Sequence, residues 1–390
     1  MNKIRTINLC RTLIVFFSCS MVCAGSNLHI GSLEIHPFQS VEQTYNDNIY
    51  LEAEYLNNSD QITKSQLGIS LRKPARSRDE YVFKARYFAD IYQYNNHEKE
   101  DRTDHTVDAQ ADFLFAGQLI LKLDERYKKT ADPPNSELTN LEKRVRNING
   151  AVIGYKGRLF SFEVNSQYIR DNYENLGFLD KKEYVTSETI SVFLSPKTSL
   201  FGEYNFGQMR YDLASGIDSD YSQWRGGIKS RISQKITAVI KGGHKATDYN
   251  DTRTITEKDF KGGTFFAHIT YNAKARTAVE LFGDRTTVES TYLTNNYYVR
   301  NQGGARIDQK LINRIYITGT GSYQLNAYPE ELTDSGFTAK RRDHVRIWTG
   351  GLRYELAGWL QISGGYTFSE RDSNFNYLDY KNNVYSGKIS

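Results

Sequence analysis

Apolar and polar residues alternate with a period of two along most of the chain beyond residue 30. Tyr81, Phe83 and Ala85 would share one face of an extended segment, and Lys84 and Arg86 would share the other. The same alternation recurs in residues 107–115, 119–126, 160–165 and 314–321. Because successive side chains of a β-strand point to opposite faces, this period predicts strands with one apolar and one polar face.

Short and long connections alternate between the predicted strands. Tight turns are expected at eight places, near residues 74–79, 116–117, 156–158, 196–197, 233–235, 272–274, 309–311 and 357–358. Longer polar loops are expected at nine places, residues 46–61, 95–104, 128–143, 171–182, 212–220, 250–257, 286–295, 326–343 and 372–378. These seventeen connections imply 18 strands, the first at about residues 33–44 and the last at about residues 381–390.

This pattern predicts an all-β fold, a transmembrane antiparallel β-barrel of about 18 strands with short periplasmic turns and long extracellular loops. A bilayer admits strands only when the sheet closes on itself and leaves no edge unpaired. Aromatic residues at strand ends, such as Tyr92, Tyr94, Tyr127 and Trp359, are expected in the interfacial girdles. A soluble propeller is the alternative, but its blades use four short strands per repeat, whereas this chain has two long ones.

Composition agrees with a barrel and excludes other classes. The mean hydropathy is −0.61, and no apolar run of about 20 residues could form a membrane-spanning helix. Aromatic residues make up 13% of the chain, which argues against disorder. A polar average with many aromatic residues is what strands between lipid and water would produce.

The first 24 residues have the features of a secretory signal peptide. Lys3, Arg5 and Arg11 are basic, residues 12–17 begin a short apolar core, and Ala24 would precede the cleavage site. The domains expected are therefore a signal peptide, residues 1–24, and an outer-membrane β-barrel domain, residues 25–390. A lipoprotein modified at a cysteine is the rival interpretation, but no convincing lipobox precedes Cys19 or Cys23.

Removing residues 1–24 changes the chemistry expected of the mature chain. All three cysteines, Cys10, Cys19 and Cys23, would leave with the signal peptide, which excludes disulfides, zinc-thiolate sites and cysteine nucleophiles. Three positive charges would leave too, so Lys+Arg falls from 50 to 47 against Asp+Glu 46 and the net charge falls from +4 to +1. A general nucleic-acid-binding surface loses its compositional support.

Two terminal segments carry a family resemblance. Residues 45–50 (YNDNIY) follow the first predicted strand, and residues 366–374 (YTFSERDSN) and 380–385 (YKNNVY) form the closing stretch. The chain resembles the outer-membrane β-barrel porin family found in exopolysaccharide biosynthesis operons (EpsL type). The resemblance implies export or surface assembly of a polysaccharide at the outer membrane of a Gram-negative bacterium, with periplasmic export components as partners.

The C-terminus departs from the usual pattern of such barrels, which commonly end in an aromatic residue. This chain ends in Lys388, Ile389 and Ser390. The expectation is that either a few residues follow or assembly tolerates the variation.

No residue pattern indicates an enzyme, a cofactor or a metal centre. The seven histidines are scattered without paired metal-ligand spacing. Asn46, Asp47 and Asn48 offer oxygen ligands for calcium, but Asn and Asp also favour tight bends, and turn chemistry explains them better. We therefore expect no catalytic, cofactor-binding or metal-binding residues.

One basic patch stands out on the predicted water-facing surface of two neighbouring strands, where no acidic residue shares that face. It comprises Arg225, Lys229, Arg231, Lys241 and Lys245. Patches of Lys and Arg select anions in pores. The hypothesis is that this patch contacts an acidic polysaccharide or its lipid-linked precursor during passage.

The function expected from the sequence is thus an outer-membrane channel for exopolysaccharide export or surface assembly, in contact with the lipid bilayer, without covalent chemistry and without nucleic acid. A general or substrate-specific uptake porin is equally compatible with every predicted strand. A structural or adhesive barrel without transport is the third alternative. The sequence leaves open whether a loop folds into the lumen.

Overall fold

The computed structural model describes residues 28–74, 81–115, 118–213, 216–251, 253, 256, 258–274, 276–291 and 294–390. The predicted signal peptide lies outside these residues and stays a prediction, as do the tight turn at residues 116–117 and nearly all of that at residues 74–79. In the described ranges no helix has the length and apolar character needed to cross a membrane.

The described chain is almost entirely β-structure. Its strands are β1 (Leu28–Ile30), β2 (Leu33–Asn46), β3 (Asp60–Lys73), β4 (Val82–Tyr94), β5 (Arg102–Phe115), β6 (Leu119–Thr130), β7 (Arg144–Lys156), β8 (Phe160–Tyr173), β9 (Lys181–Ser195), β10 (Thr198–Tyr211), β11 (Ser219–Ser230), β12 (Ile236–Tyr249), β13 (Phe260–Lys274), β14 (Thr277–Glu289), β15 (Tyr297–Ile312), β16 (Ile315–Asp334), β17 (Phe337–Ala357), β18 (Leu360–Ser373) and β19 (Tyr380–Ile389). Short 3-10 turns lie in the long loops: η1 (Glu54–Leu56), η2 (Glu98–Glu100), η3 (Gly177–Leu179) and η4 (Asn376–Leu378).

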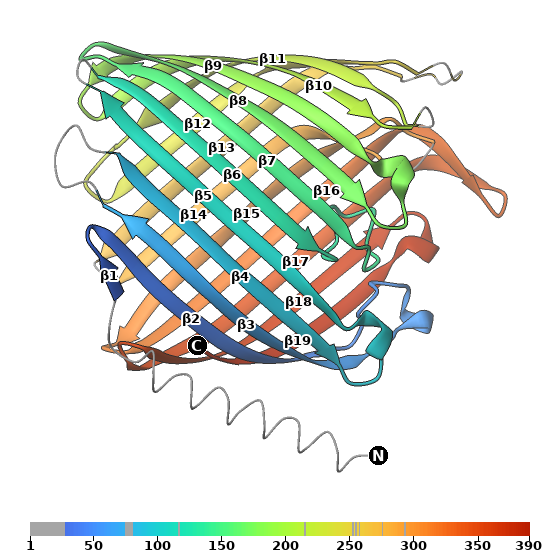
Figure 1. Cartoon of the computed structure of the whole chain (residues 1–390). Coiled ribbons are helices and arrows are strands. Elements are labelled where there is room, and N and C mark those ends of the chain that lie inside the picture. Colours follow the sequence, from blue (N-terminus) through green and yellow to red (C-terminus); the bar gives the residue numbers. More distant parts are fainter. Residues whose placement is uncertain are drawn as a thin grey trace.

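The sheet closes into a barrel of 18 strands, which confirms the predicted fold class. Each strand from β2 to β19 pairs antiparallel with its neighbours in sequence, and β19 pairs with β2 to complete the ring (Figure 1). Short turns gather at one end of the barrel, the periplasmic end, and long loops at the other. The three-residue β1 was not predicted; it pairs with Leu33–Ile35 of β2, an edge that β19 leaves uncovered because it pairs only with residues 41–46.

The two segments that carry the family resemblance meet where the barrel closes. Asp47 accepts hydrogen bonds from the backbone N–H and the side-chain amide of Asn383, both at 2.7 Å. Asn48 is fully buried and donates to the carbonyls of Lys381 (3.0 Å) and Glu52 (2.7 Å). These contacts join the end of the first barrel strand to the start of the last one. The side chains of Asp47 and Asn48 are therefore used in hydrogen bonds within the protein, which agrees with their interpretation as turn residues.

The two faces of the barrel wall differ as the alternation predicts. Ile153 and Trp224 point outward and are 63% and 65% exposed, where lipid would cover them. Inward residues are mostly polar, as in the ion pair between Lys64 of β3 and Asp90 of β4 (3.1 Å). Polar side chains thus concentrate on the inward face of the strands, and large aliphatic side chains and many aromatic ones lie on the outward face.

The girdle assignment of Tyr92 and Tyr94 is wrong. Both tyrosines share the inward face of β4 with Asp90, and Tyr94 is buried in a cluster with Ile49 and Ile62. Tyr92 packs against the same cluster. The error arose because a strand end in sequence does not reveal on which side of the wall its last residues point.

The connection between β16 and β17 also differs from expectation. Residues 326–343 were expected to form a loop, but β16 and β17 continue as a paired hairpin up to Asp334 and Phe337, beyond a bulge between Ala327 and Glu331 (Figure 1). The turn consists of Ser335 (φ 49°) and Gly336 (φ 83°). Two consecutive positive φ angles match the tight turns that twist with a β-hairpin, so a Ser-Gly pair extends the strands.

The packing between β11 and β12 yields a test of the wall. A Cβ added at Gly243 would collide with the backbone carbonyl of Trp224, whereas one added at Gly226 would meet nothing within 4 Å. Gly243→Ala should therefore lower the free energy of unfolding by about 1–3 kcal/mol, and Gly226→Ala should change it by less than about 0.5 kcal/mol. Reversible urea unfolding in lipid or detergent measures both values; equal stabilities would contradict the packing described.

Candidate functional site

The loop between β6 and β7, residues 131–143, folds into the barrel instead of extending away from it. Its first residue, Ala131, is 2% exposed. At its tip, Ser136 and Glu137 contact β15, β16, β18 and the connection between β14 and β15. β15 and β16 lie on the opposite side of the ring from β6 and β7. This inward loop therefore crosses the lumen near its extracellular end.

Glu137 binds the connection between β14 and β15. Its carboxylate accepts hydrogen bonds from the Ser290 hydroxyl (2.9 Å), the Thr291 N–H (2.6 Å) and the Thr291 hydroxyl (3.1 Å). The residue is 5% exposed, and burial raises the pKa of its carboxyl group, although these donors and nearby Arg341 oppose that shift. An Asx turn presents it: the side-chain oxygen of Asn135 accepts from the Glu137 N–H at 2.9 Å.

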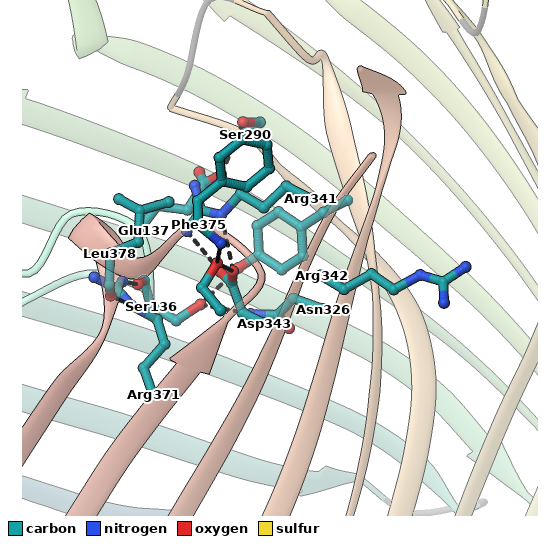
Figure 2. A network of polar contacts seen from close by, with 12 residues as sticks. Ser136, Glu137, Ser290, Asn326, Arg341, Arg342, Asp343, Arg371, Phe375 and Leu378 are labelled. Atoms are coloured by element: carbon teal, nitrogen blue, oxygen red, sulfur yellow. Dashed lines mark hydrogen bonds and ion pairs between the residues drawn. The ribbon is translucent and has the colours of Figure 1, made fainter. Parts of the chain in front are cut away.

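Ser136 connects the inward loop to three further strands. Its carbonyl oxygen accepts from the Arg371 guanidinium of β18 (2.5 Å). Its hydroxyl oxygen accepts from the Asn326 amide of β16 (3.0 Å) and lies 3.4 Å from the Tyr298 hydroxyl of β15. Figure 2 shows Asn326 and Arg371 approaching the loop from separate strands, while Arg342 points away.

The contacts of Ser136 and Glu137 with the opposite wall form a junction, and a buried ion pair stabilises the wall side of it. Arg341 donates twice to the Asp343 carboxylate (2.9 and 2.6 Å), and the two side chains are 3% and 0% exposed. The Ser373 hydroxyl donates to the same carboxylate at 2.8 Å. The Arg341 guanidinium also lies 4.5 Å from the centre of the Tyr328 ring. Buried charges with complete partners specify one geometry, so the far wall offers the loop a fixed docking surface.

The extracellular ends of β14 and β15 form a second inward element. Pairing between β13 and β14 stops at Phe265 and Arg285, so the first residues of β13, 260–264, have no β14 partner. Beyond that point the end of β14 contacts side chains of β12 instead of pairing with β13. Lys245 of β12 donates to the Thr287 hydroxyl (2.7 Å), and Tyr249 of β12 donates to Glu289 (3.1 Å). The tip is held by the wall on one side and by Glu137 on the other.

The base of the inward loop is anchored on its own side of the ring, by residues from β3 to β6 and the connection before β3. Leu141 packs against the cluster of Ile49, Ile62 and Tyr94. Asp132 accepts from Lys128 at 2.9 Å and lies 3.7 Å from Arg102. The loop is thus fixed at its base and at its tip.

All five residues of the predicted basic patch occupy positions that face the lumen, but their side chains have different partners. Arg225 and Lys241 both donate to Glu203 of the neighbouring strand β10, Lys241 at 2.9 Å. Lys245 donates to Thr287, and its ammonium lies 4.6 Å from the Tyr221 ring. Within the described ranges, Lys229, Arg231 and Lys245 have no carboxylate at ion-pair distance, and of these three only Lys229 and Arg231 are exposed. The patch therefore reduces to two cations near the β11–β12 turn that are both exposed and unpaired.

Sequence reasoning missed the inward loop and the junction it forms. Ser136 lies 162 residues from Tyr298, 190 from Asn326 and 235 from Arg371 in the chain. No local pattern encodes such distant contacts. Pro133, Pro134 and Asn135 signal a local turn, but that signal does not indicate which way the loop folds. In the part of the chain described, no three His, Cys, Asp or Glu side chains are placed to hold a metal ion.

A closed barrel with an apolar outer face and a polar lumen defines an outer-membrane β-barrel of the porin type. The chain belongs to the family described as "Putative beta-barrel porin 2", which matches residues 27–388. It is a porin-like β-barrel channel of the Gram-negative outer membrane. No curated protein matches the sequence.

Several solved structures have a similar fold. A BenF-like porin from Pseudomonas fluorescens Pf-5 is 8% identical, with 92% of this chain and 98% of that chain covered and a TM-score of 0.50. The outer membrane protein opdK from Pseudomonas aeruginosa is 10% identical, with 92% and 99% covered and a TM-score of 0.48. OccAB3 from Acinetobacter baumannii is 10% identical, with 92% and 98% covered and a TM-score of 0.48. At these identities the likeness concerns the fold alone.

The junction predicts that Glu137 holds the inward loop in place. Glu137→Ala leaves the partly buried Thr291 N–H and the Ser290 hydroxyl without this partner, which costs about 2 kcal/mol and should accelerate protease cleavage within residues 131–143 roughly 30-fold. Asn140→Ala, in an exposed part of the same loop, serves as the control and should cleave like the wild type. Equal cleavage of the two variants would contradict the anchoring role of Glu137.

Proposed function

We propose that the protein is an uptake porin for small hydrophilic solutes, with a channel narrowed at its extracellular end by the inward loop. One observation carries the proposal: Ser136 and Glu137 anchor this loop to strands on the far side of the lumen. A loop fixed across the opening subdivides it, so passage depends on solute size. Polar inward residues provide a hydrated path with weak contacts at several sites.

Export of an exopolysaccharide receives less support. That expectation rests on terminal segments whose described contacts, Asp47 with Asn383 and Asn48 with Lys381, serve to close the barrel. A polymer would also have to pass a loop that is hydrogen-bonded to the opposite wall. Uptake of small solutes needs no rearrangement of this kind, and the porin family match is compatible with it.

We expect the positive side chains of the lumen wall to favour the passage of anions over cations. Lys229 and Arg231 are the exposed members of the basic patch that have no carboxylate at ion-pair distance in the described ranges. Both lie near the periplasmic turn between β11 and β12. Unpaired Lys and Arg side chains on a pore wall raise the local concentration of anions. A structural role without transport has no comparable observation in its favour.

The inward loop should limit ion flow. Wild-type protein in planar lipid bilayers should form discrete channels, and Glu137→Ala should raise the single-channel conductance because a released loop widens the opening. Asn140→Ala is again the control, with wild-type conductance expected. A wild-type barrel that forms no channels would contradict the proposed function.

The two unpaired cations should set charge selectivity. Lys229→Gln combined with Arg231→Gln should lower the anion-to-cation permeability ratio by roughly a factor of two at low salt, where screening is weakest. Lys261→Gln is the control, because Lys261 lies on the outward face of β13. Reversal potentials under a salt gradient measure the ratio, and an unchanged ratio in the double variant would refute the role of these residues.

A further inference from the structure

A cavity lies on the lumen wall close to the periplasmic turns that follow β13, β15 and β17. Its cavity has a volume of about 560 Å³, within the range of roughly 300–1,000 Å³ typical of small-molecule sites. The lining residues that bear on its chemistry are Arg276, Arg306, Asp308, Lys310, Tyr316 and Arg353. None of them belongs to the basic patch of β11 and β12.

The charge balance of this cavity is positive. Arg306 is compensated, because it donates twice to Asp308 of the same strand (2.7 and 3.1 Å). Arg353 lies 3.7 Å from Glu355, which is too far for a hydrogen bond. Lys310 and Arg276 have no carboxylate at ion-pair distance among the residues that the structure describes. Four cations thus face three carboxylates, Asp308, Glu355 and Glu280, which lies opposite Arg306 on β14.

The guanidinium of Arg353 keeps its donors available. In the described part of the chain its side chain makes no hydrogen bond, and 44% of that side chain is exposed to the lumen. A guanidinium presents paired N–H groups that match the two oxygens of a carboxylate or phosphate group. A bound oxyanion would accept charge-assisted hydrogen bonds from these donors.

Tyr316 fixes the arrangement of the cations. Its ring centre lies 4.3 Å from the guanidinium carbon of Arg353 and 5.2 Å from the ammonium of Lys310. Its hydroxyl donates to Glu355 at 3.2 Å, so part of the acceptor capacity of Glu355 is used away from Arg353. Cation–π attraction therefore holds two positive groups beside one ring and partly separates one of them from its carboxylate.

We propose that this cavity is a binding site for small organic solutes that carry an oxyanion, either a carboxylate or a phosphate group. This proposal rests on the proposed uptake function. It adds the chemical class of the solute and the place where the solute binds before it enters the periplasm. Lys310 and Arg353 contact the oxyanion, and Tyr316 positions them. Glu355 opposes binding, because it competes for Arg353.

Calorimetric titration of the purified, folded barrel in detergent tests the site without requiring conductance. The probes are succinate, glycerol 3-phosphate and, as a neutral control, glycerol. Lys310→Gln with Arg353→Gln should weaken binding of the oxyanion probe about tenfold, whereas Glu355→Gln should tighten it. Lys122→Gln is the matched control, an inward lysine near the β5–β6 turn on the opposite side of the ring, and should bind like the wild type.

The outcomes separate the site from the proposed function. Binding of succinate alone or glycerol 3-phosphate alone supports the site and identifies the group it takes. Binding of neither probe, equal binding of glycerol, or unchanged affinity in the double variant overturns it. If the barrel conducts ions but binds neither probe, the proposed site is wrong and the uptake function stands. If it binds a probe but conducts no ions, the site stands and the uptake function is wrong. If the double variant does not fold by circular dichroism, Glu355→Gln still decides, because only the proposed site predicts tighter binding.

Discussion

The structure depends on one constraint: inside a bilayer every backbone N–H and C=O must find a partner within the protein. Closure between β2 and β19 satisfies this requirement for the two strands that would otherwise be edges. Asp47 and Asn48 extend the closure beyond the last paired residues through Asn383 and Lys381. A ring of 18 strands leaves an interior too wide for wall side chains to fill, so the polar faces of all strands border a common lumen.

A wide ring can be narrowed only by chain that leaves the wall, and two segments do so here. The inward loop crosses from β6 and β7, and the ends of β14 and β15 bend inward from the other side. Glu137 joins them through Ser290 and Thr291, so each segment limits the movement of the other. Hydrogen bonds organise this extracellular constriction, whereas unpaired cations lie nearer the periplasmic turns on two separate walls, at Lys229 and at Lys310. Selection by size would thus precede selection by charge.

The sequence allowed the barrel to be predicted but not its interior arrangement. Alternation in segments such as residues 119–126 depends only on neighbouring positions, and it was enough to predict the strands and the inward direction of Lys122 and Arg225. Charge pairing across strands was harder: Glu203 neutralises Arg225 and Lys241 from a strand that the basic patch did not include. The inward loop could not be predicted, because Ser136 finds its partners more than 160 residues away. The family resemblance lay in segments that close the barrel, which is why it indicated fold more reliably than substrate.

The central claim is that the inward loop restricts this channel to small solutes. Swelling of liposomes containing the wild-type protein, measured with uncharged sugars of increasing length, tests it most directly. We expect rapid entry of monosaccharides, a steep fall in the entry rate with increasing sugar length, and a shift of that size limit to longer sugars in Glu137→Ala. Equal entry of long oligosaccharides and monosaccharides into wild-type liposomes would contradict it.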